Sequence, residues 1–299
     1  MKILLFGKNG QVGWELQRSL APLGQLVALN TDNKKLCGDF INLAGIDQTV
    51  REVAPDIIVN AAAYTAVDKA ESEPERAHTI NAQAPGILAQ AAKRQKAWLI
   101  HYSTDYIFDG SGCNPRVETE TAAPLNVYGE TKLAGEKLIA TSGCAHLIFR
   151  TSWVYATHGN NFIKTMLRLA QEQDHLNIIN DQIGTPTGAE LLADITAHAI
   201  RTAQHRPEVS GLYHLAAKGH TSWYGYANFV FEYARTKIPL KIKPDRILPI
   251  ASNDFPTHAK RPLNSRLDTR KLQNTFSLNL PDWQIGVTRM LAETLKKQT

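Results

Sequence analysis

Tyr128 and Lys132 stand four residues apart in the stretch NVYGETKLAGEK, which is predicted to form a helix. Residues at positions i and i+4 share one face of a helix, so the phenol and the ammonium can point at the same place. A phenol has an ordinary pKa of about 10, which makes it a poor acid or base at neutral pH, and a nearby ammonium lowers that pKa. The pair therefore predicts a tyrosine that exchanges a proton with a substrate.

The stretch GKNGQVG places Gly7, Gly10 and Gly13 directly after the first predicted strand and at the start of the first predicted helix. Glycines there permit a tight turn and let the backbone approach a pyrophosphate, whose charge is stabilised by the N-terminal amides of the helix. A glycine triplet alone is weak evidence, but its place in the chain favours dinucleotide binding over a structural turn. We expect Gln11 and Val12 to contact the cofactor as well.

A hydroxyl that could orient the reacting oxygen comes from Thr104, at the carboxyl end of the predicted strand WLIHYST. With a nicotinamide cofactor bound at the glycine turn, Lys132 would also hydrogen-bond its ribose, and Tyr128 would line the same site. A Tyr-x-x-x-Lys pair alone arises by chance on many helices. Together with Thr104 and the glycine turn, it predicts a catalytic group of Tyr128, Lys132 and Thr104.

The second predicted strand ends at Asn30, where a carboxylate that accepts from the ribose 2′-hydroxyl is usual. Asn30 bonds a hydroxyl without repelling a 2′-phosphate, and Lys34 and Lys35 follow closely, so the sequence does not choose between NADH and NADPH. Asp39 and Phe40 could hold the adenine. The alternative for these two is an acidic turn residue beside a core aromatic.

The stretch NAAAYTAVDKAE follows the third predicted strand, at the edge where an open parallel sheet binds its ligands. The small side chains of Ala62 and Ala63 would let the backbone pass close to a cofactor, and Tyr64 and Thr65 could reach its phosphates or riboses. For each alanine alone, packing of a helix on the sheet explains the residue equally well.

Continuous apolar runs of strand length alternate with Ala-rich helical patterns through the first half of the chain. Such runs are typical of strands buried on both faces of a parallel sheet. The sequence therefore predicts an α/β, doubly wound (Rossmann) fold. The predicted strands are KILLFG, LVALN, DIIVNAA, WLIHYST and HLIFRTS, and the helices between them are expected to begin near Gln11, Ile46, Pro74 and Asn126.

After about residue 155 the pattern loosens into a smaller, mostly helical lobe. We expect residues 1–155 to form the dinucleotide-binding domain and residues 156–299 to form mainly a substrate-binding lobe. A strand such as GLYHLAA could return to the main sheet, and a Pro-rich stretch from Ile238 to Leu267 is expected to be non-helical. Four helices are predicted in NNFIKTMLRLAQEQ, GAELLADITAHAIRTA, SWYGYANFVFEYARTK and DWQIGVTRMLAETLKK, with a short strand in NIIND.

Composition sets the class of protein. The chain has 299 residues, 43% of them hydrophobic and 20% charged, which is typical of a globular protein. Its net charge of +5 comes from scattered basic residues, so nucleic acid is not expected as a partner, and no apolar segment is long enough to cross a membrane. Three widely spaced cysteines, Cys37, Cys113 and Cys144, fit neither a disulfide framework nor a zinc site, and they favour the cytoplasm.

In these motifs the chain resembles the extended short-chain dehydrogenase/reductase superfamily, and within it the dTDP-4-dehydrorhamnose reductases. The resemblance extends over nearly the whole length and is most specific in STDYIFDG, YGETKLAGE, RTSWVY and RPLNSRLD. It implies hydride transfer from NADPH or NADH to the C4 ketone of a dTDP-6-deoxy-4-keto-hexose. The product, dTDP-L-rhamnose, would supply cell-surface polysaccharide of the O-antigen type.

The resemblance also assigns roles to residues. It implies that Tyr128 is the proton donor and that Thr104 orients the carbonyl. Asp105 and Trp153 resemble contacts to the sugar nucleotide, although Trp153 could instead be a core aromatic. Arg261 and Arg266 could neutralise the diphosphate, since a bidentate guanidinium suits it, or they could be ordinary surface arginines.

Members of the family are described as homodimers that use magnesium, so the resemblance implies both for this chain. The acidic residues at the corresponding places are Glu15, Glu190 and Glu293. None belongs to a metal-binding motif, and glutamates on a solvated helix face are an equally good interpretation. A magnesium ion held there would be structural.

Three other functions share this fold. A sugar-nucleotide dehydratase needs an Asp-Glu pair after the threonine, and here Tyr106 follows Asp105, which argues against dehydration. An epimerase would oxidise and re-reduce its substrate with a retained cofactor, and the sequence does not exclude it. A non-catalytic dinucleotide-binding regulator is the third alternative, disfavoured because Thr104, Tyr128 and Lys132 are all present.

Overall fold

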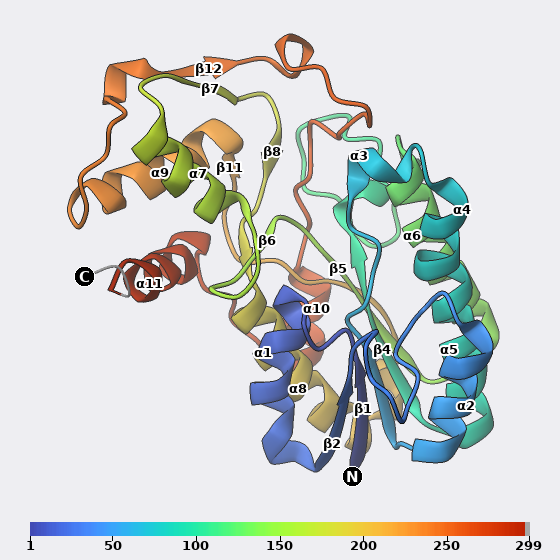
Figure 1. Ribbon diagram of the computed structural model, residues 1–299. Coiled ribbons are helices and arrows are strands. Elements are labelled where there is room, and N and C mark those ends of the chain that lie inside the picture. The colour runs from blue at the N-terminus through green and yellow to red at the C-terminus, as the bar shows by residue number, and fades with distance from the viewer. Residues whose placement is uncertain (297–299) are drawn as a thin grey trace.

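The core of the molecule is a six-stranded sheet in which every pair of neighbours is parallel, as Figure 1 shows. The computed structural model describes residues 1–296. The order of strands is β10-β5-β4-β3-β1-β2, so the chain reverses direction across the sheet after β2. The doubly wound fold is confirmed, and so are all five predicted strands. Their bounds are Lys2–Phe6 (β1), Gln25–Leu29 (β2), Ile57–Asn60 (β3), Trp98–Thr104 (β4) and His146–Thr151 (β5).

The sixth strand, β10 (Gly211–His214), comes from GLYHLAA in the second half of the chain and pairs with β5. The return of this segment to the main sheet, which the sequence left open, is thereby confirmed. The helix α8 (Ala189–His205) and the helix α10 (Arg270–Phe276) also come from the second half and pack on the main sheet. The division of the chain at residue 155 stays a prediction.

Helices cover both faces of the sheet (Figure 1). On one face, α1 (Gln11–Leu20) and α8 pack side by side. On the other face lie α2 (Leu43–Val53), α5 (Ala84–Gln95) and α6 (Val127–Ser142). The predicted starts at Gln11 and Asn126 are confirmed, with Asn126 as the N-cap of α6, whereas α2 begins three residues before Ile46 because Asn42 caps it. A short helix, α4 (Pro74–His78), begins at Pro74 as predicted and leads through a π-helical turn into α5.

Helix α6 is fixed at both ends and along its length. The side chain of Asn126 accepts from the backbone N–H of Gly129 at 2.8 Å and donates to the carbonyl of Lys260 at 2.7 Å, which ties the start of the helix to the C-terminal half of the chain. At the other end Gly143 takes the left-handed conformation (φ 74°) that ends many helices. In the middle, Gly135 lets the backbone of Asn81 approach closely. These contacts fix the position of α6 along the direction of the strands.

The smaller lobe lies beyond the carboxyl edge of the sheet. Its core is formed by α7 (Phe162–Glu172), α9 (Trp223–Arg235) and α11 (Trp283–Lys296), which confirms three predicted helices. Strands β7 (Leu176–Ile179) and β12 (Ile247–Ile250) form a small parallel sheet above them. Two further pairs are β6 (Val154–Tyr155) with β9 (Thr187–Gly188), and β8 (Ile183–Gly184) with β11 (Thr221–Ser222).

The stretch from Ile238 to Leu267, predicted to be non-helical, contains no α-helix but has two 3-10 turns, Pro244–Arg246 and Ser252–Asp254, and it contributes β12, which the sequence analysis missed. A proline at Pro249 masked the strand, and edge strands tolerate proline. The sequence analysis also missed two short helices. They are α3 (Val67–Ala70), between β3 and α4, and α10, between β10 and α11. Within residues 1–296, no helix is both long and apolar enough to span a membrane.

Gly135→Ala is expected to lower the free energy of unfolding by about 1–3 kcal/mol, because a Cβ atom there would lie 2.2 Å from the carbonyl oxygen of Asn81. Urea unfolding measures the change. Lys137→Ala, on the exposed side of the same helix, is the control and should change stability by about 0.5 kcal/mol or less. A stabilised Gly135→Ala variant would show only the higher helix propensity of alanine, and would contradict the close contact.

Candidate active site

Tyr128 and Thr104 meet at the carboxyl edge of the sheet, where β4 ends and α6 begins. The Thr104 hydroxyl lies close enough to lower the pKa of the Tyr128 phenol, and the ring of Tyr106 lies edge-on to the ring of Tyr128 at 5.8 Å between centroids. Thr104 is buried at the last position of β4, beside Thr151 at the last position of β5. The structure therefore brings the predicted proton donor and the predicted orienting hydroxyl close together.

Lys132 lies one turn further along α6, and its side chain is only 2% exposed. Its Nζ donates to the backbone carbonyl of Tyr102 at 2.5 Å and lies 3.3 Å from Nε2 of His101. Burial lowers the pKa of Lys132 to about 8, against the opposing charge of Glu136. The ammonium is thus held by β4, the strand that ends at Thr104.

The phenol of Tyr128 has a raised pKa, which differs from the expectation. The pKa is raised to about 12, mainly by burial; the Thr104 hydroxyl opposes this shift and the Asp105 carboxylate adds to it. The prediction that Lys132 brings this pKa down is wrong for this arrangement of side chains. Removal from water destabilises the charged phenolate by more than the neighbouring Thr104 hydroxyl stabilises it.

Asp105 is buried directly beside the reactive hydroxyls. Its Oδ1 accepts from Thr104 Oγ1 at 3.2 Å, and its Oδ2 is buried without a hydrogen-bond partner in the described part of the chain. Burial raises the pKa of this carboxyl to about 7, although hydrogen bonds with Ser265 and Thr104 oppose the shift. An unpaired buried oxygen is costly, so it marks a position that suits a ligand hydroxyl.

Two more buried hydroxyls at this edge lack partners among residues 1–296, Ser103 Oγ on β4 and Thr151 Oγ1 on β5. The sequence analysis missed both. Their signal was the run of hydroxyl residues that ends each strand, Ser103-Thr104 in one and Thr151-Ser152 in the other. Parallel pairing of β4 with β5 brings the two runs together at the site.

The glycine turn has the geometry that a dinucleotide requires. Gly7 has φ +82°, and a Cβ atom on it would lie 2.6 Å from the backbone nitrogen of Ala62. A Cβ atom on Gly13 would lie 2.0 Å from the carbonyl of Gly7, so helix α1 packs tightly on the turn. Gly10 is the N-cap of α1 and has no side chain that could cap the helix. The backbone amides of Gln11 and Val12 at the helix N-terminus can therefore bind an anion.

The loop after β3 runs beside this turn. Its backbone is held by two asparagines: Asn60 Oδ1 accepts from the N–H of Ala62 at 3.0 Å, and Asn81 Oδ1 accepts from the N–H of Tyr64 at 2.9 Å. The phenol of Tyr64 donates to Glu73 at 2.9 Å, and Thr65 is exposed. Ala62 and Ala63 lie in this loop as predicted, next to Gly7.

The residues expected at the adenosine end surround the end of β2. Asn30 follows β2, and its side chain donates to Asp32 at 3.3 Å. Phe40 is buried edge-on against Phe6, the core position that the sequence left open as an alternative. A polar hollow of about 430 Å³ lies nearby, and its lining includes Asp39, Lys34 and Lys35.

The predicted substrate residues divide between two places. Arg261 pairs with Asp68 at 2.6 Å and lines a hollow of about 320 Å³ together with Tyr106 and Trp223. Trp153 has a left-handed backbone (φ 47°) and stacks on Trp223 at 3.6 Å, so it adjoins the same hollow through its neighbour. Arg266 instead donates to Asn264 at 2.9 Å. Tyr106 and Trp223 are lining residues that the sequence analysis missed.

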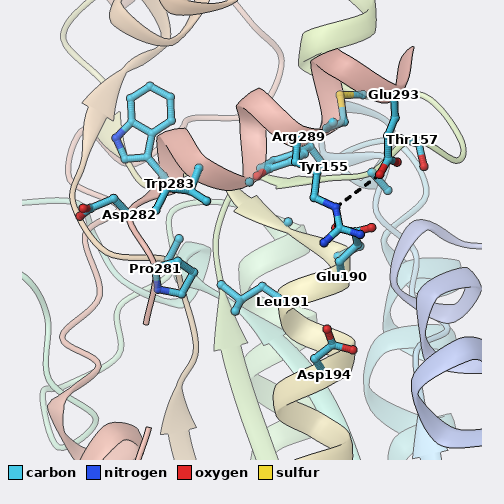
Figure 2. A pocket seen from close by; sticks show the side chains of 17 residues that line it. Tyr155, Thr157, Glu190, Leu191, Asp194, Pro281, Asp282, Trp283, Arg289 and Glu293 are labelled. Atoms are coloured by element: carbon cyan, nitrogen blue, oxygen red, sulfur yellow. Dashed lines mark hydrogen bonds and ion pairs between the residues drawn. The ribbon is translucent and has the colours of Figure 1, made fainter. Parts of the chain in front are cut away.

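Of the three glutamates expected to bind magnesium, Glu190 interacts electrostatically with the other two, and each of the three pairs with an arginine. Figure 2 shows Arg289 between Glu190 and Glu293, with its Nε 3.6 Å and 3.3 Å from their carboxylates. Glu15 pairs with Arg18 at 3.4 Å. No group of three or more His, Cys, Asp or Glu within residues 1–296 is arranged to hold a metal ion. Magnesium is therefore not supported, and its binding by these three glutamates stays a prediction.

Comparison with known proteins gives a consistent result over the whole chain. The family described as RmlD substrate binding domain matches residues 1–296. The chain is 62% identical over 294 residues to a dTDP-4-dehydrorhamnose reductase of Escherichia coli (strain K12), covering 98% of each chain. It is 58% identical over 299 residues to the Salmonella typhimurium reductase, covering 100% of each. The crystal structure of dTDP-4-dehydrorhamnose reductase from Bacillus anthracis in complex with NADP is similar with a TM-score of 0.87, at 35% identity over 98% of this chain and 99% of that one.

The parallel sheet, the glycine turn after β1 and the Thr-Tyr-Lys group at the carboxyl edge define an NAD(P)H-dependent oxidoreductase of the extended short-chain dehydrogenase/reductase superfamily. Within that superfamily the chain belongs to the dTDP-4-dehydrorhamnose reductase family. The predicted enzyme class and the predicted function in dTDP-rhamnose synthesis are thereby confirmed.

The rate of reduction should depend on the charge of Lys132. We expect kcat/KM for NADPH to be constant below neutral pH and to fall as the pH rises through about 8, because the buried ammonium loses its proton there. The measurement is a pH profile of initial rates. Asp105→Asn is the control, since a decline near pH 7 that disappears in this variant would belong to the Asp105 carboxyl instead. A profile that stays flat through pH 8 would contradict the assignment.

Proposed function

We propose that this chain reduces the C4 ketone of dTDP-4-dehydro-L-rhamnose to the alcohol of dTDP-L-rhamnose, with Tyr128 as the proton donor. The bound dinucleotide supplies the hydride, which adds to C4. The carbonyl oxygen takes the proton of the Tyr128 hydroxyl, and the phenolate left behind regains a proton from solvent. The observation that carries this proposal is the placement of Tyr128 beside Thr104 at the sheet edge, with Lys132 one turn further along α6.

The raised pKa of Tyr128 suits the direction of reduction. A phenol with a pKa of about 12 keeps its proton at neutral pH, so it stands ready as a donor. Negative charge that develops on the carbonyl oxygen promotes proton transfer from Tyr128. The Thr104 hydroxyl stabilises the same oxygen by a hydrogen bond. Lys132 then offsets the charge of the phenolate, and it also bonds the cofactor ribose.

The sugar nucleotide is expected to occupy the hollow between the turn after β4, α3 and the lobe. Arg261 lies in its lining and would pair with the diphosphate in place of Asp68. The aromatic side chains of Trp223 and Phe255 offer faces for the base, and Trp153 would lie over the sugar. The unpartnered Oδ2 of Asp105 would accept from a sugar hydroxyl. Arg266 is turned toward Asn264 and is a weaker candidate for the diphosphate.

NADPH is the cofactor that the adenosine end favours. Asn30 itself carries no charge, although it donates to Asp32, and two lysines, Lys34 and Lys35, line the nearby hollow. A relative from Bacillus anthracis was solved in complex with NADP, which supports the same choice. NADH would bind without the phosphate contacts.

Tyr106 bears on the dehydratase alternative. The position after Asp105 holds a phenol instead of a second carboxylate, and burial raises the pKa of Tyr106 well out of the range in which it could exchange protons at neutral pH. Asp105 therefore lacks the partner that elimination of water needs. An epimerase stays open as an alternative, and consumption of NADPH distinguishes the two.

Assembly and location remain predictions. We expect a homodimer in the cytoplasm, and the reaction would supply dTDP-L-rhamnose for surface polysaccharide of the O-antigen type. Cys37, Cys113 and Cys144 are all free thiols in the structure, which suits a reducing compartment.

The decisive experiment follows NADPH absorbance with dTDP-4-dehydro-L-rhamnose, and with its GDP and UDP counterparts. We expect stoichiometric oxidation of NADPH with the dTDP sugar and much slower oxidation with the others. Conversion of the sugar without net consumption of NADPH would favour an epimerase. Binding of NADPH without turnover of any 4-keto sugar would favour a regulatory protein.

Tyr128→Phe should lower kcat by about 10²–10⁴-fold, because the carbonyl oxygen loses its proton donor, while the affinity for NADPH changes little. Tyr213→Phe is the matched control, since its hydroxyl donates to the carbonyl of Val209 on the far side of the sheet. An unchanged kcat in Tyr128→Phe would remove the phenol from the mechanism.

Replacing Lys34 and Lys35 together with alanine should raise KM for NADPH by about tenfold and leave KM for NADH unchanged, since a charge-assisted contact to a phosphate is worth about 1.4 kcal/mol or more. Steady-state kinetics with each cofactor test this. Lys137→Ala on the outer face of α6 is a control that removes one exposed lysine away from the hollow that Lys34 and Lys35 line. Equal changes for the two cofactors would show that these lysines do not read the 2′-phosphate.

A further inference from the structure

A chain of buried hydrogen bonds runs across the sheet from the loop after β3 to Lys132. The backbone N–H of Ala62 donates to Asn60 Oδ1 at 3.0 Å, and Asn60 Nδ2 lies 3.0 Å from His101 Nδ1. His101 Nε2 lies 3.3 Å from Lys132 Nζ, which also donates to the carbonyl of Tyr102. Asn60 and His101 are each 1% exposed, so water does not compete for these groups.

The register of the sheet creates this chain. Asn60, the last residue of β3, pairs directly with His101 of β4, and side chains paired across parallel strands lie side by side on one face. Helix α6 packs on that face and directs Lys132 toward the same point. Sequence analysis missed both residues because a single polar residue inside an apolar strand carries no spacing pattern.

The orientation of the Asn60 amide decides which nitrogen of His101 carries the hydrogen. Asn60 uses its carbonyl oxygen for Ala62, so its NH₂ group faces Nδ1 of His101 and donates to it. A neutral imidazole has one N–H, and an accepting Nδ1 places that hydrogen on Nε2. The Nε2–H then points at Nζ of Lys132, which can accept it only as a neutral amine.

A charged Lys132 requires the opposite arrangement. The ammonium has only donors, so Nε2 of His101 must accept and the hydrogen must sit on Nδ1. The Nδ1–H then needs the carbonyl oxygen of Asn60, the amide turns over, and the N–H of Ala62 loses its acceptor. That N–H belongs to the loop packed against Gly7 of the glycine turn.

We propose that His101 is a positioning residue for the reduction, which holds Nζ of Lys132 in place and couples its charge to the loop after β3 by a change of tautomer. This inference rests on the proposed function only in giving Lys132 its part in turnover. His101 itself touches neither of the reacting hydroxyls in the structure. It acts through Lys132 on one side and through Asn60 on the other.

The charges around Lys132 leave this coupling intact. Glu136, on the same helix, favours the ammonium, and it is itself paired with Arg150 of β5 at 2.7 Å. From β4 the ammonium faces His101, whose pKa burial holds well below 6.5, with the charge of Lys132 lowering it further. The imidazole therefore stays neutral and responds to Lys132 only by moving its hydrogen from one nitrogen to the other.

Imidazole ¹⁵N spectra of the intact protein test the coupling directly. We expect His101 to stay neutral from about pH 6 to about pH 10, a range that spans the ordinary pKa values of histidine and lysine. Its hydrogen should move from Nδ1 to Nε2 with rising pH, at the midpoint of the alkaline fall in kcat/KM. His101→Gln identifies the signal among the ten histidines. In Lys132→Met the tautomer should no longer depend on pH.

Variants test the effect on turnover. His101→Leu should lower kcat by about tenfold, the factor that one hydrogen bond to a charged group is worth, with little change in KM for the sugar nucleotide. In this variant the fall of kcat/KM at alkaline pH should occur about half a pH unit lower or more, because Nζ of Lys132 then faces an apolar group that disfavours the ammonium. His101→Gln should recover much of the lost kcat and much of the shift in the pH profile. His198→Leu, which removes a ring bonded to the carbonyl of Phe276, is the control and should match the wild type.

Two results would overturn the proposal: a His101 tautomer that is constant with pH in the active enzyme, or a His101→Leu variant with the wild-type pH profile. Failure of the proposed function has a different signature. Full activity in Lys132→Met would remove Lys132 from turnover, while the spectra of the wild-type protein could still show the coupled tautomer.

Discussion

Two buried charged side chains on successive turns fix α6 against the sheet, and the site depends on them. Lys132 bonds the backbone of β4, and Glu136 pairs with Arg150 of β5. Buried charges are tolerated only when fully partnered, so sliding or rotating α6 would break both sets of contacts at once. Tyr128, one turn before Lys132, is therefore held near Thr104 by the packing of α6, although a long irregular segment connects β4 to α6.

Burial also determines which groups of the site are protonated near neutral pH. Taking groups out of water raises the pKa of the Tyr128 phenol to about 12 and of the Asp105 carboxyl to about 7, and it lowers the pKa of Lys132 to about 8. A phenol that keeps its proton, with a cation one helical turn away, is the arrangement that donates a proton to a ketone oxygen. His101, kept neutral by burial, lies behind the cation and connects it to the loop that borders the glycine turn.

Much of the fold was predictable because its signals are local. The five apolar strands, the glycine triplet and the cap of α6 at Asn126 were all found at their places. The strand β12 was missed because Pro249 interrupts its pattern, and Asn60 and His101 were missed because each is a lone polar residue in an apolar run. The glutamates expected to hold magnesium do interact electrostatically, but no pattern in the sequence showed that Arg289 would pair with two of them.

The sequence by itself determined the elements, the order of the motifs and the family, because hydrophobic period, glycine spacing and residue identity are properties of the chain. The tertiary structure decided the protonation states and the partners. Whether Lys132 lowers the pKa of Tyr128 depends on burial and distance, and the structure shows that burial prevails. The register of β3 on β4 likewise brought Asn60 beside His101. Such contacts join residues far apart in the chain, and only the packed sheet brings them within reach of one another.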